Sequence, residues 1–267
     1  MAYKRIALLL CACIFVFARV QAQTSCPTNI DFELGNFTNW NLYTGLCCPI
    51  STPTPGQVTG RDTITGGTAT DPFGGFPVVA PASGVYSLKL GNSNTNAEAE
   101  RARYYVHVPS GVNNYSVIFR YAVVFEDPGH NAADQPRFEV KAFDSATNAI
   151  VNCSQFTYVA ASNLPGFALS TVRNNTYYKS WATASLNLTG YAGRTVAIDF
   201  ASGDCALGAH FGYGYVDMNC GLFQIQTLLN CDTASTISLS APPGFDTYVW
   251  RDSATMSYMT SGQNVNI

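Results

Sequence analysis

The sequence predicts an all-β protein built as a sandwich of two sheets. Tyr115–Glu126 alternates along its whole length and carries apolar side chains on both faces, as expected for a strand covered on each side. Similar segments recur along the chain between turns rich in Gly, Pro and Asn, and none has the period of a normal helix. Charged residues make up only 12% of the chain and aromatic residues 13%, which favours strands. A sandwich or jelly roll is therefore favoured over a barrel.

The first residues have the pattern of a secretory signal peptide. Lys4 and Arg5 precede an apolar run ending at Phe17, which is shorter than the roughly 20 residues of a spanning helix. Val20-Gln21-Ala22 fits a cleavage site. We expect residues 1–22 to be removed, leaving a secreted or cell-surface protein with no membrane span.

Charge excludes two classes of partner. Without the leader, 11 basic residues face 17 acidic ones, a net charge of −6. Because no basic patch is present, nucleic acid and anionic membranes are not expected partners.

The strands expected after the leader are justified by alternation and by turn residues. Ile30, Phe32 and Leu34 alternate with acids, and Trp40 begins the next apolar patch, whereas 47–81 is rich in Gly, Pro and Thr and reads as a long loop. The remaining expected strands, in chain order, are Tyr86–Leu90, 104–108, Tyr115–Glu126, Arg137–Asp144 with its hairpin partner Ile150–Val159, 177–188, 195–201 and 211–226.

The composition changes at Cys231. Residues 231–267 indicate two or three strands around Pro242-Pro243-Gly244, with Trp250 on the central one. These residues are too few for an immunoglobulin-type sandwich, which needs roughly 100. We therefore expect a jelly-roll sandwich over 23–230, the start of a second, immunoglobulin-like β domain over 231–267, and a sequence that is a piece of a longer protein.

Seven cysteines remain after the leader, and export predicts that they are oxidised. Seven is odd, so we expect Cys231 to be the unpaired thiol. Cys47 and Cys48 are neighbours and are not expected to bridge each other. A zinc site is not expected either, because histidine is scarce and no CxxC pair occurs.

Four segments resemble known proteins. DFELGNFTNW at 31–40 and GVYSLKLG at 84–91 resemble the opening strands of jelly-roll carbohydrate-binding modules. FRYAVVFEDPGHNAADQPRFEVKAFD at 119–144 and DCALGAHFGYGYVDMNCG at 204–221 resemble large cell-surface proteins of Bacteroidetes. Those proteins join such a jelly roll to immunoglobulin-like or PKD-like repeats and leave the cell by type IX secretion. The resemblance covers roughly residues 26–260 and implies location and architecture more than activity.

The two ends of a jelly roll usually lie side by side. If the segment around Ile30 pairs with the last strand, Glu33 and Asp217 approach each other, and two close carboxylates favour a cation between them. The resemblance adds that related modules often hold a structural Ca²⁺ with these acids. The alternative is that both face solvent or accept backbone N–H bonds. The same pairing predicts a Cys26–Cys220 disulfide. For Cys205 the candidate disulfide partners are then Cys153, Cys47 and Cys48.

The candidate ligand-binding residues lie on the central strand and its exit turn. Arg120 is the best polar candidate because a charge on a central strand must be paired or hydrated, and Glu126, Asp127 and His130 surround the turn. Exposed aromatic residues would stack on sugars; for most of the candidates core packing is the alternative. They are Trp40, Tyr43, Tyr121, Trp181, Tyr213 and Tyr215.

Catalysis is not expected. Glu126 with Glu139 is the nominal carboxylate pair of a glycosidase, but the chain has no spacing signature and no GxSxG, HExxH or P-loop motif. We expect a non-catalytic binding or adhesion protein whose jelly roll binds a glycan or a protein partner. The alternatives are an accessory module of an exported polysaccharide hydrolase, whose catalytic domain lies outside this sequence, and a purely structural matrix domain.

The calcium site leads to a first prediction. If Glu33 and Asp217 hold a structural Ca²⁺, chelation will lower the melting temperature of the purified protein and added Ca²⁺ will restore it, because a ligand that binds only the folded state stabilises it. The measurement is a thermal melt with and without chelator. An unchanged melting temperature would reject the site.

Overall fold

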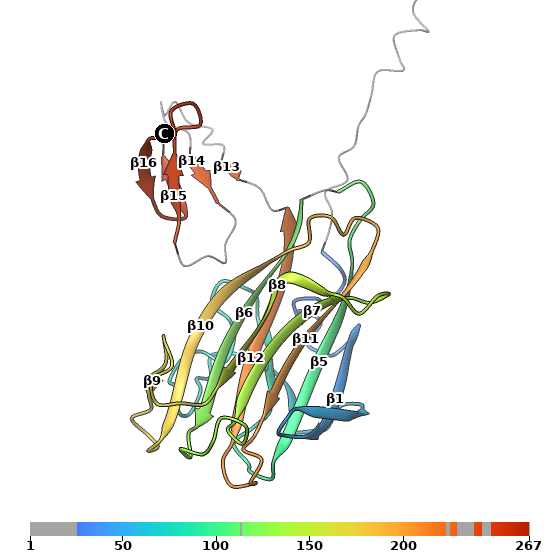
Figure 1. The fold of residues 1–267 in the computed structure, drawn as a ribbon, viewed down its shortest axis with the longest axis vertical. Coiled ribbons are helices and arrows are strands. Elements are labelled where there is room, and N and C mark those ends of the chain that lie inside the picture. The colour runs from blue at the N-terminus through green and yellow to red at the C-terminus, as the bar shows by residue number, and fades with distance from the viewer. Residues whose placement is uncertain (1–25, 113, 223–224, 229–237, 242–246, 267) are drawn as a thin grey trace, which may run out of the picture.

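The protein is a β-sandwich of two antiparallel six-stranded sheets (Figure 1). The computed structural model describes residues 26–112, 114–222, 225–228, 238–241 and 247–266. We call the two sheets sheet 1 and sheet 2. Sheet 1 has the order β2 (Ser51–Pro55), β1 (Trp40–Leu46), β5 (Glu98–His107), β11 (Thr195–Gly203), β7 (Arg137–Asp144) and β8 (Ile150–Val159). Sheet 2 has the order β3 (Asp62–Gly66), β4 (Tyr86–Leu90), β12 (Gly212–Leu222), β6 (Tyr115–Glu126), β10 (Thr176–Asn187) and β9 (Ala168–Leu169).

From β5 onward the chain passes repeatedly between the sheets. β5 lies in sheet 1, β6 in sheet 2, β7 and β8 in sheet 1, β10 in sheet 2, β11 in sheet 1 and β12 in sheet 2. Such crossing connections between two antiparallel sheets are those of a jelly roll. The predicted all-β fold is confirmed, and in the described part of the chain no helix is long and apolar enough to cross a membrane.

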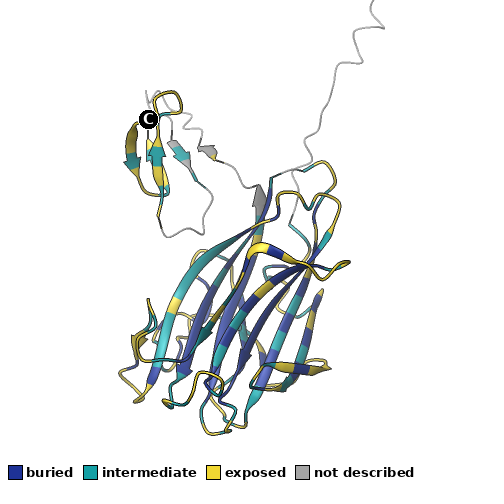
Figure 2. Cartoon of the chain, in the orientation of Figure 1, coloured by how far each residue is buried: buried dark blue, intermediate teal, exposed yellow. Residues whose placement is uncertain are grey.

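The main core lies between the sheets, and buried residues run along the strands of both (Figure 2). This core is rich in aromatic rings. Trp40 of β1 stacks on Phe32 with the ring centroids 4.3 Å apart, and it meets the edge of Tyr104 at 5.1 Å. Phe119 of β6 contacts Phe200 of β11 across the sandwich at 5.3 Å. Stacked and edge-to-face pairs of this kind add specific contact energy to the burial of apolar area, so the two sheets are fixed in register.

A second apolar cluster covers the outer face of sheet 2. Tyr213 and Tyr215 of β12 pack there, together with Val124 of β6, against Phe76 and Val79 of the connection between β3 and β4. The central strand β6 is thus buried on both faces, as its sequence predicts. The connection that covers it is the Gly- and Pro-rich stretch 67–85.

A buried carboxylate anchors this covering segment. Asp71 accepts hydrogen bonds from the hydroxyls of Tyr213 (2.7 Å) and Tyr215 (3.0 Å) and from the backbone N–H of Gly74 (2.7 Å). Burial raises the pKa of both tyrosines, so each remains a protonated donor. The ammonium of Lys89 lies 4.0 Å from the centroid of the Tyr213 ring, which places a cation beside the ring that hydrogen-bonds Asp71.

The strand predicted around Ile30 is wrong: this segment is a series of turns. The amide of Asn29 donates to the carbonyl of Asn36 at 2.9 Å, and its oxygen accepts the N–H of Leu34 at 3.0 Å. These local bonds replace a strand ladder. Ile30 and Phe32 are nevertheless fully buried. They enter the core from a loop, and their burial explains why apolar residues alternate with polar ones in this segment.

The long loop predicted over 47–81 is also wrong in part. It contains two short strands, β2 and β3, each at the outer edge of its sheet. Pro53 and Pro55 are tolerated in β2 because an edge strand need not donate every N–H. Such polar edge strands lack the alternation that reveals a central strand.

The predicted Cys26–Cys220 disulfide is confirmed. Two other cysteine predictions are wrong. Cys47 and Cys48 are bonded to each other, and the peptide bond between them is cis. Cys205 and Cys153 are free thiols. Cys47 and Cys48 are bonded to each other and are therefore not available to Cys205. Cys231 lies outside the described residues.

Beyond β12 the described strands form two small sheets. One contains β13 (Gln226–Leu228), β14 (Ser238–Ser240) and β17 (Asn264–Asn266), and the other pairs β15 (Val249–Arg251) with β16 (Tyr258–Ser261). Trp250 lies on β15, where its indole N–H donates to the carbonyl of Gly262 at 2.8 Å. Pro242-Pro243-Gly244 lies outside the described residues, and the immunoglobulin-like identity of this part stays a prediction.

The Cys26–Cys220 bond leads to a prediction about stability. It joins residues 194 apart, so replacing both cysteines with serine frees a long loop in the unfolded chain. The expected loss is roughly 2–5 kcal/mol of unfolding free energy, measured by urea denaturation. Cys153→Ser, at an exposed free thiol, is the control and should change little. Equal stabilities of the double variant and the control would contradict the prediction.

Candidate functional site

Two of the predicted ligand-binding residues have structural partners. The guanidinium of Arg120 donates from Nη1 to the hydroxyl of Ser83 at 3.0 Å. Glu126 forms an ion pair with Arg173, with 2.7 Å between Oε1 and Nη2. The pair Glu126 and Glu139 is not brought together, since alternation places Glu126 on the outer face of sheet 2 and Glu139 on the outer face of sheet 1. The central strand therefore does not carry a convergent site.

The other two predicted ligand-binding residues, Asp127 and His130, lie in the connection between β6 and β7. Asp127 accepts the backbone N–H of Gly129 at 2.9 Å and the side-chain amide of Gln135 at 2.7 Å, so it shapes the turn. His130 lies against the thiol of Cys205, 3.3 Å from Nδ1 to Sγ. The four predicted residues thus belong to separate local contacts.

The two carboxylates of the predicted calcium site have protein hydrogen-bond donors. Glu33 accepts the backbone N–H of Val85 at 3.0 Å. Asp217 is 0% exposed and accepts the hydroxyls of Ser83 at 2.7 Å and Ser87 at 2.9 Å. The pKa of Asp217 is raised to about 7, mainly by burial and to a smaller extent by the charge of Glu33, while the hydrogen bonds from Ser83 and Ser87 oppose the rise. The two acids therefore influence each other, and calcium binding stays a prediction.

Most of the aromatic candidates are core residues. Trp40, Tyr121, Tyr213 and Tyr215 are buried, and the half-buried Trp181 donates its indole N–H to the carbonyl of residue 77 at 2.7 Å. Tyr43 is different, because it alternates with the inward-facing Trp40, Leu42 and Thr44 on β1 and lies on the outer face of sheet 1.

The outer face of sheet 1 collects aromatic and charged side chains from adjacent strands. On β5, the inward Ala102, Tyr104 and Val106 alternate with outward residues. The strand pairing places Tyr43 opposite Arg101 and Arg103 opposite Asp199. We call the following set the outer platform: Tyr43 of β1; Arg101, Arg103 and Tyr105 of β5; Asp199 of β11; and Phe143 of β7.

A bidentate ion pair lies at the centre of the outer platform. Arg103 donates from Nε and Nη2 to the two carboxylate oxygens of Asp199 at 2.5 and 2.7 Å. Nη1 of Arg101 lies 3.7 Å from the same carboxylate. The hydrogen bonds to Asp199 raise the pKa of Arg103. Asp199 is only 4% exposed, so this arrangement is fixed before any ligand arrives.

Aromatic rings flank both guanidinium groups. Arg101 lies 4.6 Å from the centroid of the Tyr43 ring, and Arg103 lies 4.9 Å from that of Phe143 and 5.9 Å from that of Tyr105. Such cation–π contacts hold long side chains against the sheet. Tyr105 remains 42% exposed and presents part of its ring to solvent.

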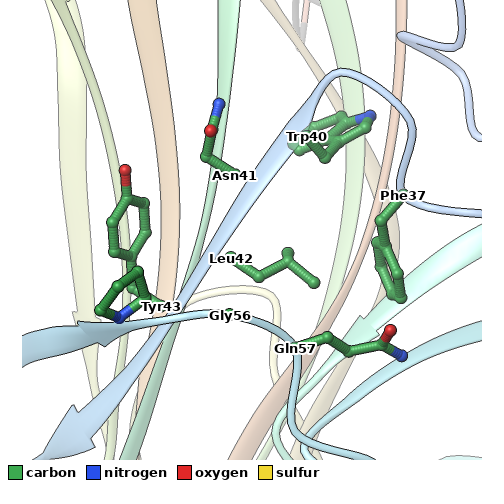
Figure 3. A pocket seen from close by; sticks show the side chains of 8 residues that line it. Phe37, Trp40, Asn41, Leu42, Tyr43, Gly56 and Gln57 are labelled. Carbon is green, nitrogen blue, oxygen red and sulfur yellow. The ribbon is translucent and has the colours of Figure 1, made fainter.

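A pocket of about 270 Å³ adjoins the outer platform at β1 (Figure 3). Tyr43 contributes to both, and Asn41, Phe37 and Gln57 also line the pocket. Its volume lies just below the range for ligand sites, roughly 300–1,000 Å³. The pocket therefore supplies one small subsite beside an extended surface.

Together, the outer platform and the pocket have the chemistry of a surface that binds polar rings. Aromatic faces accept the C–H faces of sugars, and the neighbouring Arg, Asp, Asn and Gln groups hydrogen-bond hydroxyls. Of these residues, sequence reasoning singled out Tyr43 and Trp40, which both line the pocket, and missed the rest of the outer platform. The run Arg101, Arg103, Tyr105 alternating with Ala102 and Tyr104 was the available signal, because charges in every second position of a strand mark its outward face.

No family model matches this chain, and no curated protein matches it. Solved structures do match at the level of the fold. TmCBM61 in complex with β-1,4-galactotriose is 12% identical, with 73% of this chain and 97% of that chain covered and a TM-score of 0.39. The enzymatically active domain of tailspike protein 4 from bacteriophage CBA120 is 15% identical, with 73% and only 21% covered and a TM-score of 0.38.

A third match is the family 11 carbohydrate-binding module from Clostridium thermocellum in complex with a β-1,3-1,4-mixed-linked tetrasaccharide. It is 9% identical, with 71% of this chain and 91% of that chain covered and a TM-score of 0.30. The neighbours thus include carbohydrate-binding β-sandwiches. None of the three reaches a TM-score of 0.5, and none establishes what this chain binds.

The ion pair of the outer platform leads to a prediction. Asp199→Asn removes the charge that Arg101 and Arg103 share and leaves their guanidinium groups poorly paired. The expected loss is about 2–4 kcal/mol of unfolding free energy, measured by urea denaturation. The control is Glu139→Gln, a neutralisation on the neighbouring strand β7, which should cost much less. If both variants lose the same stability, the ion pair does not organise the platform.

Proposed function

We propose that this chain is a non-catalytic glycan-binding module, and that an extended sugar chain lies across the outer platform. The observation that supports this most strongly is the array of Tyr43, Arg101, Arg103 and Tyr105 on one face of sheet 1, held in place by the buried Asp199 and Phe143. Rings and hydrogen-bonding groups follow one another across adjacent strands, which suits a ligand made of repeated polar rings.

The contrast between the two outer faces supports the choice of sheet. On sheet 2, Phe76 and Val79 of the covering segment pack over Tyr213 and Tyr215, so that face is part of the protein interior. On sheet 1, Tyr105 and Lys141 are exposed on the corresponding face. A ligand thus meets the sandwich on sheet 1 without displacing a core segment.

Preorganisation favours this surface as a binding site. A side chain that is already held in place loses little conformational entropy when a ligand binds. Arg103 is held by Asp199 and Arg101 by both Asp199 and Tyr43. Hydroxyl groups of a sugar would therefore meet fixed donors, while the remaining edges of the guanidinium groups stay accessible.

We further propose that the protein works outside the cell, secreted or attached to the surface. The leader pattern, the Cys26–Cys220 bond and the sandwich fold all support this. The attribution to type IX-secreted proteins of Bacteroidetes, with a PKD-like or immunoglobulin-like second domain over 231–267, rests on the sequence resemblance. The structural Ca²⁺ at Glu33 and Asp217 rests on the approach of the two carboxylates as well as on that resemblance.

Glycan binding by the mature chain, residues 23–267, is the direct test. We expect binding to at least one polysaccharide in a panel that includes β-galactan, mixed-linked β-glucan, xylan and pectin, measured by affinity electrophoresis and titration calorimetry. Tyr43→Ala and Arg101→Ala should each weaken binding about tenfold, since loss of one stacking or charged contact of about 1.4 kcal/mol has that effect.

The matched control is Tyr258→Ala, which removes a 61% exposed tyrosine from β16. It should leave affinity unchanged. Thermal melts of each variant separate lost binding from lost folding. Unaltered affinity in Tyr43→Ala and Arg101→Ala, or failure of the folded protein to bind any glycan of the panel, would reject the proposal in favour of a structural role.

A further inference from the structure

One turn of the sandwich brings a buried thiol next to two imidazoles. Cys205 and His210 lie at the two ends of the connection between β11 and β12, where the N–H of Cys205 donates to the carbonyl of His210 at 2.9 Å. Gly208 makes this tight turn possible: its φ is +74°, and its N–H donates to the carbonyl of Cys205 at 2.9 Å. His130 arrives from the connection between β6 and β7.

The side-chain donor atoms of these residues converge. Sγ of Cys205 lies 3.3 Å from Nδ1 of His130, and one donor atom from each of the three residues lies within 4.8 Å of the other two. The two imidazole rings are 5.4 Å apart and nearly perpendicular, at 83°. Nδ1 of His210 is buried, and no hydrogen-bond partner for it occurs in the described part of the chain.

These distances are close to those of a tetrahedral metal centre. Zinc lies about 2.3 Å from thiolate sulfur and about 2.0–2.1 Å from imidazole nitrogen, so its ligand atoms are roughly 3.4–3.6 Å apart. Sγ of Cys205 and Nδ1 of His130, which are 3.3 Å apart, already have nearly that separation. The ligand atom of His210 lies within 4.8 Å of the other two, so a movement on the order of 1 Å brings it to the spacing of a tetrahedral site.

The sulfur of Cys205 is shielded from solvent and has a backbone donor. Cys205 is 0% exposed, and the backbone N–H of Leu207 points at its sulfur from 3.4 Å. A free thiol is unusual in an exported chain, where cysteines tend to be oxidised. Coordination to a metal gives this buried thiol a defined partner, and the same partner occupies the orphaned nitrogen of His210.

We propose that Cys205, His130 and His210 form a zinc site with a fourth position for water. One soft sulfur and two imidazole nitrogens select a zinc-like metal over Ca²⁺ or Mg²⁺, which prefer oxygen. Both histidines are partly exposed, so the fourth position faces solvent. The metal joins the β6–β7 and β11–β12 connections, whose ligands lie 75 residues apart in sequence, and this separation explains why sequence spacing did not predict it.

The test uses the mature chain, stripped of metal by a chelator and dialysed. We expect one equivalent of Zn²⁺ to bind in competition with a chromophoric chelator. One equivalent of Co²⁺ should give tetrahedral ligand-field bands and a thiolate-to-cobalt charge-transfer band. Cys205→Ser and Cys205→Ala should abolish the charge-transfer band, and His210→Ala should weaken Zn²⁺ binding at least tenfold.

Matched controls are Cys153→Ser, at the exposed free thiol, and His107→Ala, at an exposed histidine of β5. Both should bind metal as the unaltered chain does. Circular dichroism confirms that each variant is folded. The proposal is overturned if folded protein gives no thiolate charge-transfer band, if Cys205→Ala and His210→Ala bind Zn²⁺ as tightly as the controls, or if the site takes only copper.

Discussion

The shared hydrogen bonds of Asp71 with Tyr213 and Tyr215 decide which face of the sandwich is left open. They hold the segment 67–85 over sheet 2, where it buries the outer side chains of β6 and β12. The start of β12 makes this possible, since Gly212 and Gly214 face inward and Tyr213 and Tyr215 outward. A Cβ on Gly214 would come within 2.5 Å of the Phe138 ring, so the inner face has no room for a side chain at that position.

With sheet 2 covered, sheet 1 carries the polar surface. Its organisation depends on one buried carboxylate, Asp199, which two arginines share. A buried charge without partners is strongly unfavourable, and here the partners are the groups that a ligand would meet. The same interaction thus stabilises β5 against β11 and fixes the hydrogen-bond donors of the outer platform.

The connections between strands carry a second kind of chemistry. Cys26–Cys220, Cys47–Cys48 and the group of Cys205 with two histidines all lie at strand ends or outside strands. The strands carry the core and the outer platform, whereas these cysteine and histidine groups depend on how the connections meet at the ends of the sheets.

The sequence by itself determined four strands of the sandwich. Tyr86–Leu90, Tyr115–Glu126, Arg137–Asp144 and Ile150–Val159 have in the structure the bounds that alternation predicts, because successive side chains of a strand point to opposite faces of its sheet. It also indicated the Cys26–Cys220 bond, since the two ends of a jelly roll meet.

Only the tertiary structure decided the features that have no regular period in the local sequence. The turns around Asn29 mimic a strand because their apolar residues reach the core from a loop, and the edge strands β2 and β3 are too polar to alternate. The outer platform depends on the register of four strands that are distant in sequence. Likewise, His130 and Cys205 meet because two separate connections end side by side. Such contacts are set by how the sheets pair and pack, and neighbouring residues in the chain do not encode that pairing.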